Sequence, residues 1–514
     1  MSLVLIMGIY LGLMLAPDSV KSPALSSEKA KKIQDILDIL DKRYVDSIDA
    51  EVLFEETISE LLHRLDPHSN YISAVDVQRS EESIRGEFKG IGVSFYLIRD
   101  TICVTNVLPN SPSLRAGLKS GDKIIRIDKD LVAGKKITNE DVMSKLKGPK
   151  DTKVKLKILR GRKMINKTVT RGVIFVKSVI APQMLKNGIG YIKIERFSDQ
   201  TYNEFADAAE SLKRKGMKKL VIDLRNNGGG ILHCATDIAD EFLSIGQTIL
   251  VTRGLHEKEK TYKASRSSSL ENTDVVVLIN AQSASASEIL AGALQDNDRG
   301  TIIGRRSFGK GLVQEDKRLK DGSILRLTIA RYYTPTGRCI QREYTGDYED
   351  YTESFYERYE NGEMYEIDSS IFVNSKKFTT PGGKVVYGGG GIMPDIFVPF
   401  DSVGITSYYR ELRYSDAFFT FAFDYVQNKR TKWKSLSEFD QKFKVTDGLL
   451  KSFTTYAENE TLVPLKQKDL NRSKSLITQT IKAEIARQLW TEDGYYRIMN
   501  KMDNDVMRAI ETLN

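Results

Sequence analysis

The residues that could do chemistry gather in one stretch of the chain, 274–314. An apolar β-branched run is followed there by small residues and then by a helical pattern, which predicts a strand, a turn and a helix. Ser285 lies at the turn, where its hydroxyl would project beside free backbone N–H groups able to bind an oxyanion. After a second short strand, Lys310 follows in a loop between Gly309 and Gly311, which let the backbone bend tightly.

A serine and a lysine of this kind could act as a nucleophile and a base. A serine hydroxyl is a weak nucleophile and needs an adjacent base. Lys310 could be that base only as a neutral amine, so burial would have to lower its pKa by several units from about 10.4. Spacing alone favours a simpler interpretation, in which the Ser-Ala repeats give close packing and Lys310 is a surface lysine.

The motifs taken together favour the catalytic interpretation over simple packing. A Ser-Ala-Ser-Ala-Ser-Glu run, a Phe-Gly-Lys-Gly loop and a glutamine four residues past the lysine are all present. Together they resemble the carboxyl-terminal processing proteases, or tail-specific proteases, of the S41 serine peptidase family. The resemblance implies that Ser285 is the nucleophile, Lys310 the general base and Gln314 the residue that orients the lysine. Asp296 corresponds to an aspartate of many members, and we expect a structural rather than a catalytic role for it.

A glycine-rich stretch, 223–230, follows a predicted buried strand at 220–224. The carboxyl ends of strands in open α/β sheets are the usual place for ligand chemistry. The resemblance implies that amides of Gly229 and Ala286 form an oxyanion hole, although the family's usual proline is Gly228 here. A phosphate-binding loop is disfavoured, because no Lys-Ser/Thr ending follows the glycines.

The surrounding elements alternate between strand and helix. A strand at 190–194, a helix at 201–215 and the strand at 220–224 predict a βαβ unit. We therefore expect residues 177–403 to form the α/β protease core, which the resemblance implies is crotonase-like (ββα). An insertion at 343–368 is rich in tyrosine and acid. We interpret it either as a surface element that contacts substrate or covers a site, or equally as a solvated loop.

Residues 86–176 combine short strand patterns with glycine turns and resemble a PDZ domain. In such domains a glycine-rich loop offers backbone N–H groups to a peptide's terminal carboxylate, and the peptide adds as a strand beside a helix. The resemblance places this loop at Gly90, Ile91, Gly92 and Val93. The alternative is a plain glycine turn.

The two ends of the chain differ from this central part. Residues 1–26 begin with an apolar stretch shorter than the roughly 20 residues of a membrane span. We interpret them as a truncated signal or anchor segment, with an ordinary buried helix as the alternative. Residues 27–85 predict helices, and their Leu-Asp-Pro-His-Ser stretch resembles a family region that supports dimer formation in some members. Residues 404–514, beyond the resemblance, predict a helical accessory domain for assembly or docking.

Length and composition limit which other classes of protein the chain could belong to. A chain of 514 residues predicts several domains. A net charge of +8 without a basic block gives no support to nucleic-acid binding. Cys103, Cys234 and Cys339 lie far apart, and the four histidines form no zinc signature. We therefore expect neither a metal nor a cofactor.

The sequence thus predicts a multi-domain α/β protein with an N-terminal helical region, a β-rich PDZ domain, a Ser–Lys protease core and a C-terminal helical extension. The expected function is that of a serine endopeptidase that recognises the free C-terminal tail of a protein or peptide substrate and cuts near it. The expected location is the periplasm or the periplasmic side of a membrane, with a homodimer among the expected assemblies. Two alternatives stay open: a catalytically silent PDZ scaffold that binds tails, and a hydrolase that uses His233 as the base.

Overall fold

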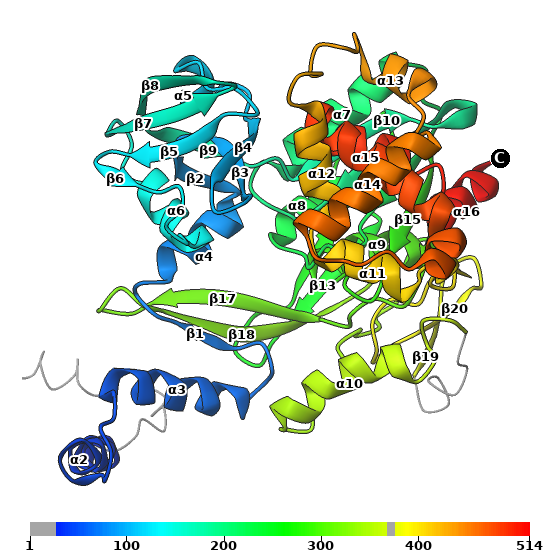
Figure 1. Cartoon of the computed structure of the whole chain (residues 1–514). Helices are drawn as coiled ribbons and strands as arrows, with labels where there is room; N and C mark the ends of the chain where they lie inside the picture. Colours follow the sequence, from blue (N-terminus) through cyan, green and yellow to red (C-terminus); the bar gives the residue numbers. More distant parts are fainter. Residues whose placement is uncertain (1–26, 367–375) are drawn as a thin grey trace, which may run out of the picture.

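The computed structural model describes residues 27–366 and 376–514 (Figure 1). The predicted signal or anchor segment, 1–26, lies outside the described residues, as does the end of the predicted insertion. Within the described residues, none of the helices combines the length and the apolar character that a membrane span requires. The predicted mixed α/β architecture is confirmed, with a β-rich domain before the core and helices at both ends.

A six-stranded sheet forms the centre of the core, in the order β10-β11-β12-β15-β16-β21. Neighbouring strands are parallel, except that β10 is antiparallel to β11. The strands are β10 Val179–Met184, β11 Ile189–Ile194, β12 Lys219–Asp223, β15 Asp274–Ile279, β16 Gly300–Gly304 and β21 Ile396–Phe397. This order places the carboxyl ends of β12 and β15 side by side, and the glycine-rich stretch and the serine run follow those two ends.

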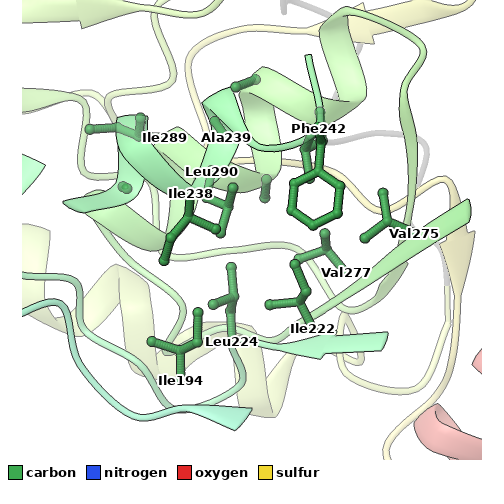
Figure 2. Close-up of a cluster of buried hydrophobic side chains, with 14 of the residues drawn as sticks. Ile194, Ile222, Leu224, Ile238, Ala239, Phe242, Val275, Val277, Ile289 and Leu290 are labelled. Carbon is green, nitrogen blue, oxygen red and sulfur yellow. The ribbon is translucent and has the colours of Figure 1, made fainter. Parts of the chain in front are cut away.

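Two helical layers cover this sheet. On one face, Ile222 and Val277 pack against three helices (Figure 2). On the other face, Val221 and Val276 pack against the last C-terminal helix, and Tyr496 joins the same cluster. The helices are α7 Thr201–Arg214, α8 Leu232–Asp240 and α9 Ala286–Asp296 on the first face, and α16 Asn504–Leu513 on the second. Burial on both faces explains why these strands are continuous apolar runs in the sequence rather than alternating patterns.

The elements that were expected around the site are confirmed. The strands predicted at 190–194 and 220–224 are β11 and β12, and the strand predicted at the start of the stretch 274–314 is β15. The helix predicted at 201–215 is α7, which ends one residue earlier, at Arg214. Long segments with strong periodicity were predictable because their hydrogen bonds and their buried faces are both local properties of the chain.

A second sheet carries the lysine loop and joins distant parts of the chain. Its order is β1-β18-β13-β14, and β17 forms an antiparallel hairpin with β18. The strands are β1 Asn70–Ile72, β13 Thr248–Arg253, β14 Lys260–Lys263, β17 Leu312–Arg318 and β18 Ile324–Tyr333. Because β1 pairs with β18, the N-terminal segment at 70–72 lies against the same hairpin that follows Lys310.

The β-rich domain contains a sheet in the order β3-β4-β5-β7-β8, with β6 beside β5, and two helices. The short strands β2 and β9, at the beginning and the end of this domain in sequence, pair with each other. Its elements are β2 Glu87–Gly90, β3 Val93–Leu97, β4 Ile102–Val107, α5 Pro112–Arg115, β5 Lys123–Ile127, β6 Asp130–Leu131, α6 Asn139–Leu146, β7 Lys153–Arg160, β8 Lys163–Thr170 and β9 Gly172–Phe175. Strand β3 lies at an edge of the sheet, so its outer hydrogen-bonding groups are open to a further strand.

Helices flank this central part of the chain. The N-terminal helices are α2 Ser27–Arg43, α3 Ala50–His63 and α4 Val77–Arg85, and α10 Tyr348–Glu360 lies in the predicted insertion. The C-terminal helices α11 Ser407–Tyr414, α12 Ala417–Val426, α13 Leu436–Lys442, α14 Asp447–Glu460 and α15 Gln467–Met499 share one apolar core. This unit also contacts the β-rich domain, because Arg99 pairs with Asp424 at 2.6 Å and with Glu460 at 2.9 Å.

Candidate active site

The three serines of the run, at the turn between β15 and α9, differ in burial and in hydrogen bonding. Ser283 and Ser287 are fully buried, and their hydroxyls donate to the carbonyls of Leu224 (2.8 Å) and Asn227 (2.9 Å). Ser285 is only half-buried, and its backbone has φ 54° and ψ −114°. A residue other than glycine in this conformation costs on the order of 1–3 kcal/mol, and such strain is common where a nucleophile is presented on a sharp turn.

Glu288 joins the serine turn to the lysine loop. One oxygen of its fully buried carboxylate accepts the N–H groups of Ser285 (2.8 Å) and Lys310 (2.9 Å). The other oxygen accepts the Gly309 N–H (2.7 Å) and the Ser307 hydroxyl (2.5 Å). Burial raises the pKa of Glu288 to about 7, while these four donors act in the opposite direction. A single carboxylate therefore fixes both backbone segments.

The side chain of Lys310 is half-buried. Its Nζ donates to Gln314 Oε1 at 2.7 Å. Burial lowers its pKa, and the nearby Arg326 lowers it further, whereas Asp66 and Glu288 raise it. The net direction favours the neutral amine, which is the form that a general base requires.

The Leu-Asp-Pro-His-Ser stretch completes this arrangement. Gln314 Nε2 donates to the backbone carbonyl of His68 at 2.5 Å. Ser69 accepts the N–H of Thr328 on β18 (3.1 Å), and Asp66 accepts the hydroxyl of the same threonine (3.1 Å). The resemblance placed this stretch only in the N-terminal helical region, and its contact with Gln314 was not predicted. The motif itself was visible, but nothing local showed that it packs against β18.

Helix α10 covers the same region. The Tyr351 hydroxyl lies 3.2 Å from His68 Nε2, and the rings of Phe308 and Phe355 are 5.2 Å apart. The guanidinium of Arg342 lies 4.0 Å from the centroid of the Tyr351 ring. Burial, followed by the charge of Lys310, lowers the pKa of His68 to about 3. Of the two interpretations of the insertion, this packing favours an element that covers the site.

The glycine-rich stretch lies directly beside the serine turn. The Asn227 carbonyl accepts the Ala284 N–H at 3.0 Å. A Cβ atom at Gly229 would lie 2.8 Å from Ser285 Cβ, so no other residue fits. In this conformation the Gly229 N–H donates to Asn227 Oδ1 at 2.9 Å, whereas Ala286 begins α9, where intrahelical acceptors are absent. The assignment of Gly229 as an oxyanion donor therefore stays a prediction.

Asp296 lies at the far end of α9. It forms a fully buried ion pair with Arg338 at 2.7 Å. The hydroxyls of Thr334 and Thr336 also donate to its carboxylate. These bonds hold the segment after β18 against α9, which agrees with the structural role expected for Asp296.

His233, the alternative base, is the second residue of α8 and is exposed. Among the hydrogen bonds of the described residues, its ring takes part in none, and only its backbone carbonyl accepts the Thr236 hydroxyl. This position contrasts with that of Lys310, whose Nζ is fixed by Gln314.

The predicted carboxylate-binding loop connects β2 to β3. Gly92 has φ +78°, and a Cβ atom there would lie 2.4 Å from Ser111 Cβ. The Ile91 side chain is buried in the core of the β-rich domain, while Val93 begins the edge strand β3. The loop therefore lies at the start of a free strand edge.

Three parts of the chain match models of known protein families. Residues 188–350 match the model of peptidase family S41, residues 90–170 match that of the PDZ domain, and residues 408–491 match a family of unknown function, DUF8443. A carboxy-terminal-processing protease of Bartonella bacilliformis is 36% identical over 314 residues, covering 60% of this chain and 71% of that protein. A probable CtpA-like serine protease of Staphylococcus aureus is 34% identical over 315 residues, covering 60% of this chain and 62% of that protein.

Among solved structures, the photosystem II D1 C-terminal processing protease is 25% identical. The match covers 71% of this chain and 88% of that protein, with a TM-score of 0.36. The chain described here belongs to peptidase family S41. Within that family it is a member that carries a PDZ domain ahead of the peptidase core.

Proposed function

We propose that this protein is a serine endopeptidase of the carboxyl-terminal processing type, with Ser285 as the nucleophile and Lys310 as the general base. The observation that carries the proposal is Glu288, whose buried carboxylate binds the backbone of both residues. The Tyr332 hydroxyl also donates to the carbonyls of both, at 3.2 Å and 2.6 Å. Two segments that are distant in sequence are thus fixed to each other at the residues that the reaction needs.

In the proposed mechanism, the neutral amine of Lys310 takes the proton of the Ser285 hydroxyl as the oxygen attacks the scissile carbonyl. One amine hydrogen stays bonded to Gln314 Oε1, so the nitrogen lone pair is directed by a fixed partner. The Ala286 N–H binds the developing oxyanion, together with an amide of the glycine stretch. Protonated Lys310 then donates to the leaving amine, and water releases the acyl-enzyme by the same steps.

The amide of Gly229 can join the oxyanion hole only if it leaves Asn227 Oδ1 or shares its hydrogen between two acceptors. A shift of the glycine stretch on substrate binding would achieve this. The proposed mechanism therefore places a small conformational step before the chemical step.

We propose that the PDZ domain selects substrates by their free C-terminal carboxylate. The free edge of β3 and the loop from Gly90 to Val93 support this proposal. The Staphylococcus and Bartonella relatives bear protease names, and the second is called carboxy-terminal-processing. Recognition through backbone amides would accept many sequences, provided that the last residue carries its charge.

A substrate with an amidated C-terminus is expected to be cut at least tenfold less efficiently than the free acid. Loss of the charge weakens the hydrogen bonds from the loop, which are worth about 1.5–3 kcal/mol each when one partner is charged. The measurement is kcat/KM for a matched pair of substrates that differ only in the terminal group. Equal values for the two substrates would contradict tail recognition by this domain.

Replacement of Glu288 by glutamine is expected to lower both the melting temperature and kcat. The new amide group must face two of the four donors, and a buried unsatisfied donor costs about 1–3 kcal/mol. The resulting displacement of Ser285 or Lys310 should reduce kcat by about tenfold or more. Glu315→Gln, on the exposed part of β17, is the matched control and should behave as the wild type. Wild-type kcat in a folded Glu288→Gln variant would refute this role.

We further propose that two copies associate through the N-terminal helices. Several large apolar side chains of α2 and α3 are about half exposed, and these helices lie at one end of the molecule, away from the core (Figure 1). The residues are Ile33, Ile36, Ile39, Phe54 and Leu61. An exposed apolar surface of this kind is typical of an interaction site.

The double variant Ile36→Lys/Leu61→Lys is therefore expected to be monomeric under conditions where the wild type is dimeric. Light scattering coupled to size exclusion measures the mass of both. Ile245→Lys, at another exposed apolar site, should leave the mass unchanged. A wild type that is monomeric, or a double variant that remains dimeric, would argue against this interface.

A further inference from the structure

The C-terminal helix α16 contacts the core sheet on the face opposite α9. Its buried residues Val506, Ala509 and Leu513 pack against Tyr191 and Val276 of the central strands. Asp503 caps the helix, since its carboxylate accepts the Val506 N–H at 3.1 Å. This packing places the start of α16 beside the carboxyl end of β12, where the glycine stretch begins.

At that point the helix meets Arg225, near the start of the glycine-rich stretch 223–230. Arg225 Nη1 donates to Asp505 at 2.7 Å and to both oxygens of Asp503 at 2.9 Å. The remaining guanidinium nitrogens donate to Asp223 at 3.0 Å and 2.7 Å. Asp505 also binds Arg305 at 2.8 Å and 3.0 Å, and only 5% of it is exposed. Such buried charges need all of their partners, because an unpaired charge in this environment is strongly unfavourable.

A short series of hydrogen bonds and contacts connects Arg225 to Ser285. The next residue, Asn226, exchanges two hydrogen bonds with Asn280, at 3.0 Å and 2.7 Å. Asn227 binds the Ala284 N–H through its carbonyl, and Gly229 packs on Ser285 Cβ. A displacement of Arg225 would therefore move the glycine stretch, whose amide is proposed above as an oxyanion donor.

We infer that Asp503 and Asp505 are positioning residues for the oxyanion hole. They touch no reacting atom and act through Arg225, which they hold at the start of the glycine stretch. The inference rests on the proposed function of this site. It adds to the site a part of the chain that lies beyond the S41 match at 188–350.

The competing interpretation is that these carboxylates only anchor α16 to the sheet. In that case their loss would lower stability and leave the kinetics of the folded enzyme unchanged. Positioning predicts weaker binding of the transition state with substrate binding intact, because the oxyanion forms only after the serine attacks the carbonyl.

The test uses the full chain with Asp505→Asn, which preserves shape and removes charge. We expect kcat to fall by about tenfold or more and KM to change by less than about twofold. Affinity for a peptide boronate should fall in parallel with kcat, while binding of an uncleaved peptide to the Ser285→Ala background should not change. Glu511→Gln, on the exposed side of α16, is the matched control and should match the wild type in all three measurements. A folded Asp505→Asn enzyme with wild-type kcat and boronate affinity would overturn the inference.

Two further measurements keep the test decisive. If Asp505→Asn does not fold, Asp503→Asn replaces it, because asparagine also caps a helix and Asp503 is more exposed. Asp503→Asn should lower kcat by a smaller factor than Asp505→Asn. An unchanged kcat in the Asp503→Asn variant would overturn the inference. Hydrogen exchange of residues 225–230 should be faster in either variant, and this readout needs no activity. A wild type without peptidase activity would contradict the proposed function. In that case the exchange measurement still decides the inference: faster exchange in the variants would support positioning, and unchanged exchange would refute it.

Discussion

Replacement of Ser285 by alanine is expected to abolish peptide-bond hydrolysis while the fold remains intact. Loss of a catalytic nucleophile typically costs about four or more orders of magnitude in kcat. Alanine keeps the Cβ atom that the backbone already accommodates at φ 54°, so stability should change little. The measurement is cleavage of an unfolded test protein, with the melting temperature as the check on folding.

The neighbouring serines provide the controls for this prediction. Ser283→Ala and Ser287→Ala remove buried hydrogen bonds to Leu224 and Asn227, so they should lower stability but retain activity when folded. Cleavage by Ser285→Ala, together with its loss in a folded Ser283→Ala or Ser287→Ala variant, would show that the wrong serine was chosen. Binding of tail peptides should survive in Ser285→Ala, which separates catalysis from the PDZ domain. A wild type that binds tails and never cleaves would instead support the silent scaffold.

Lys310→Arg is expected to be as inactive as Lys310→Ala, with a loss of several orders of magnitude in kcat. Arginine keeps the positive charge but cannot lose its proton in a protein, so it cannot act as a base. Lys317→Arg, on the exposed part of β17, is the matched control and should retain activity. His233→Ala should also retain substantial activity, because its exposed ring is not needed in the proposed mechanism.

The pH dependence follows from the same residue. Burial lowers the pKa of Lys310, so the neutral, active form prevails above that lowered value. Activity should therefore rise toward alkaline pH and fall as the pH drops through the lowered pKa of Lys310 in the folded enzyme. Full activity of Lys310→Arg, or a wild-type rate that rises toward acidic pH, would exclude the Ser–Lys mechanism.

The sequence by itself determined the local parts of this site. The strand, turn and helix around Ser285 follow from a β-branched run, small residues and a helical pattern that are contiguous in the chain. The parallel strands and α7 were predictable for the same reason, since periodicity and propensity are properties of neighbouring residues. The glycines around Lys310 and before Ile231 likewise marked backbone that bends tightly, although not what it bends around.

Only the tertiary structure decided how these parts meet. Glu288 was visible as the end of the serine run, but its bonds to Gly309 and Lys310 depend on β16 lying next to β15. The Gln314–His68 contact joins residues 246 apart in sequence, and the Arg225–Asp505 pair joins residues 280 apart. Such bonds leave no local pattern, because strand order and the packing of distant helices determine them rather than the residues on either side.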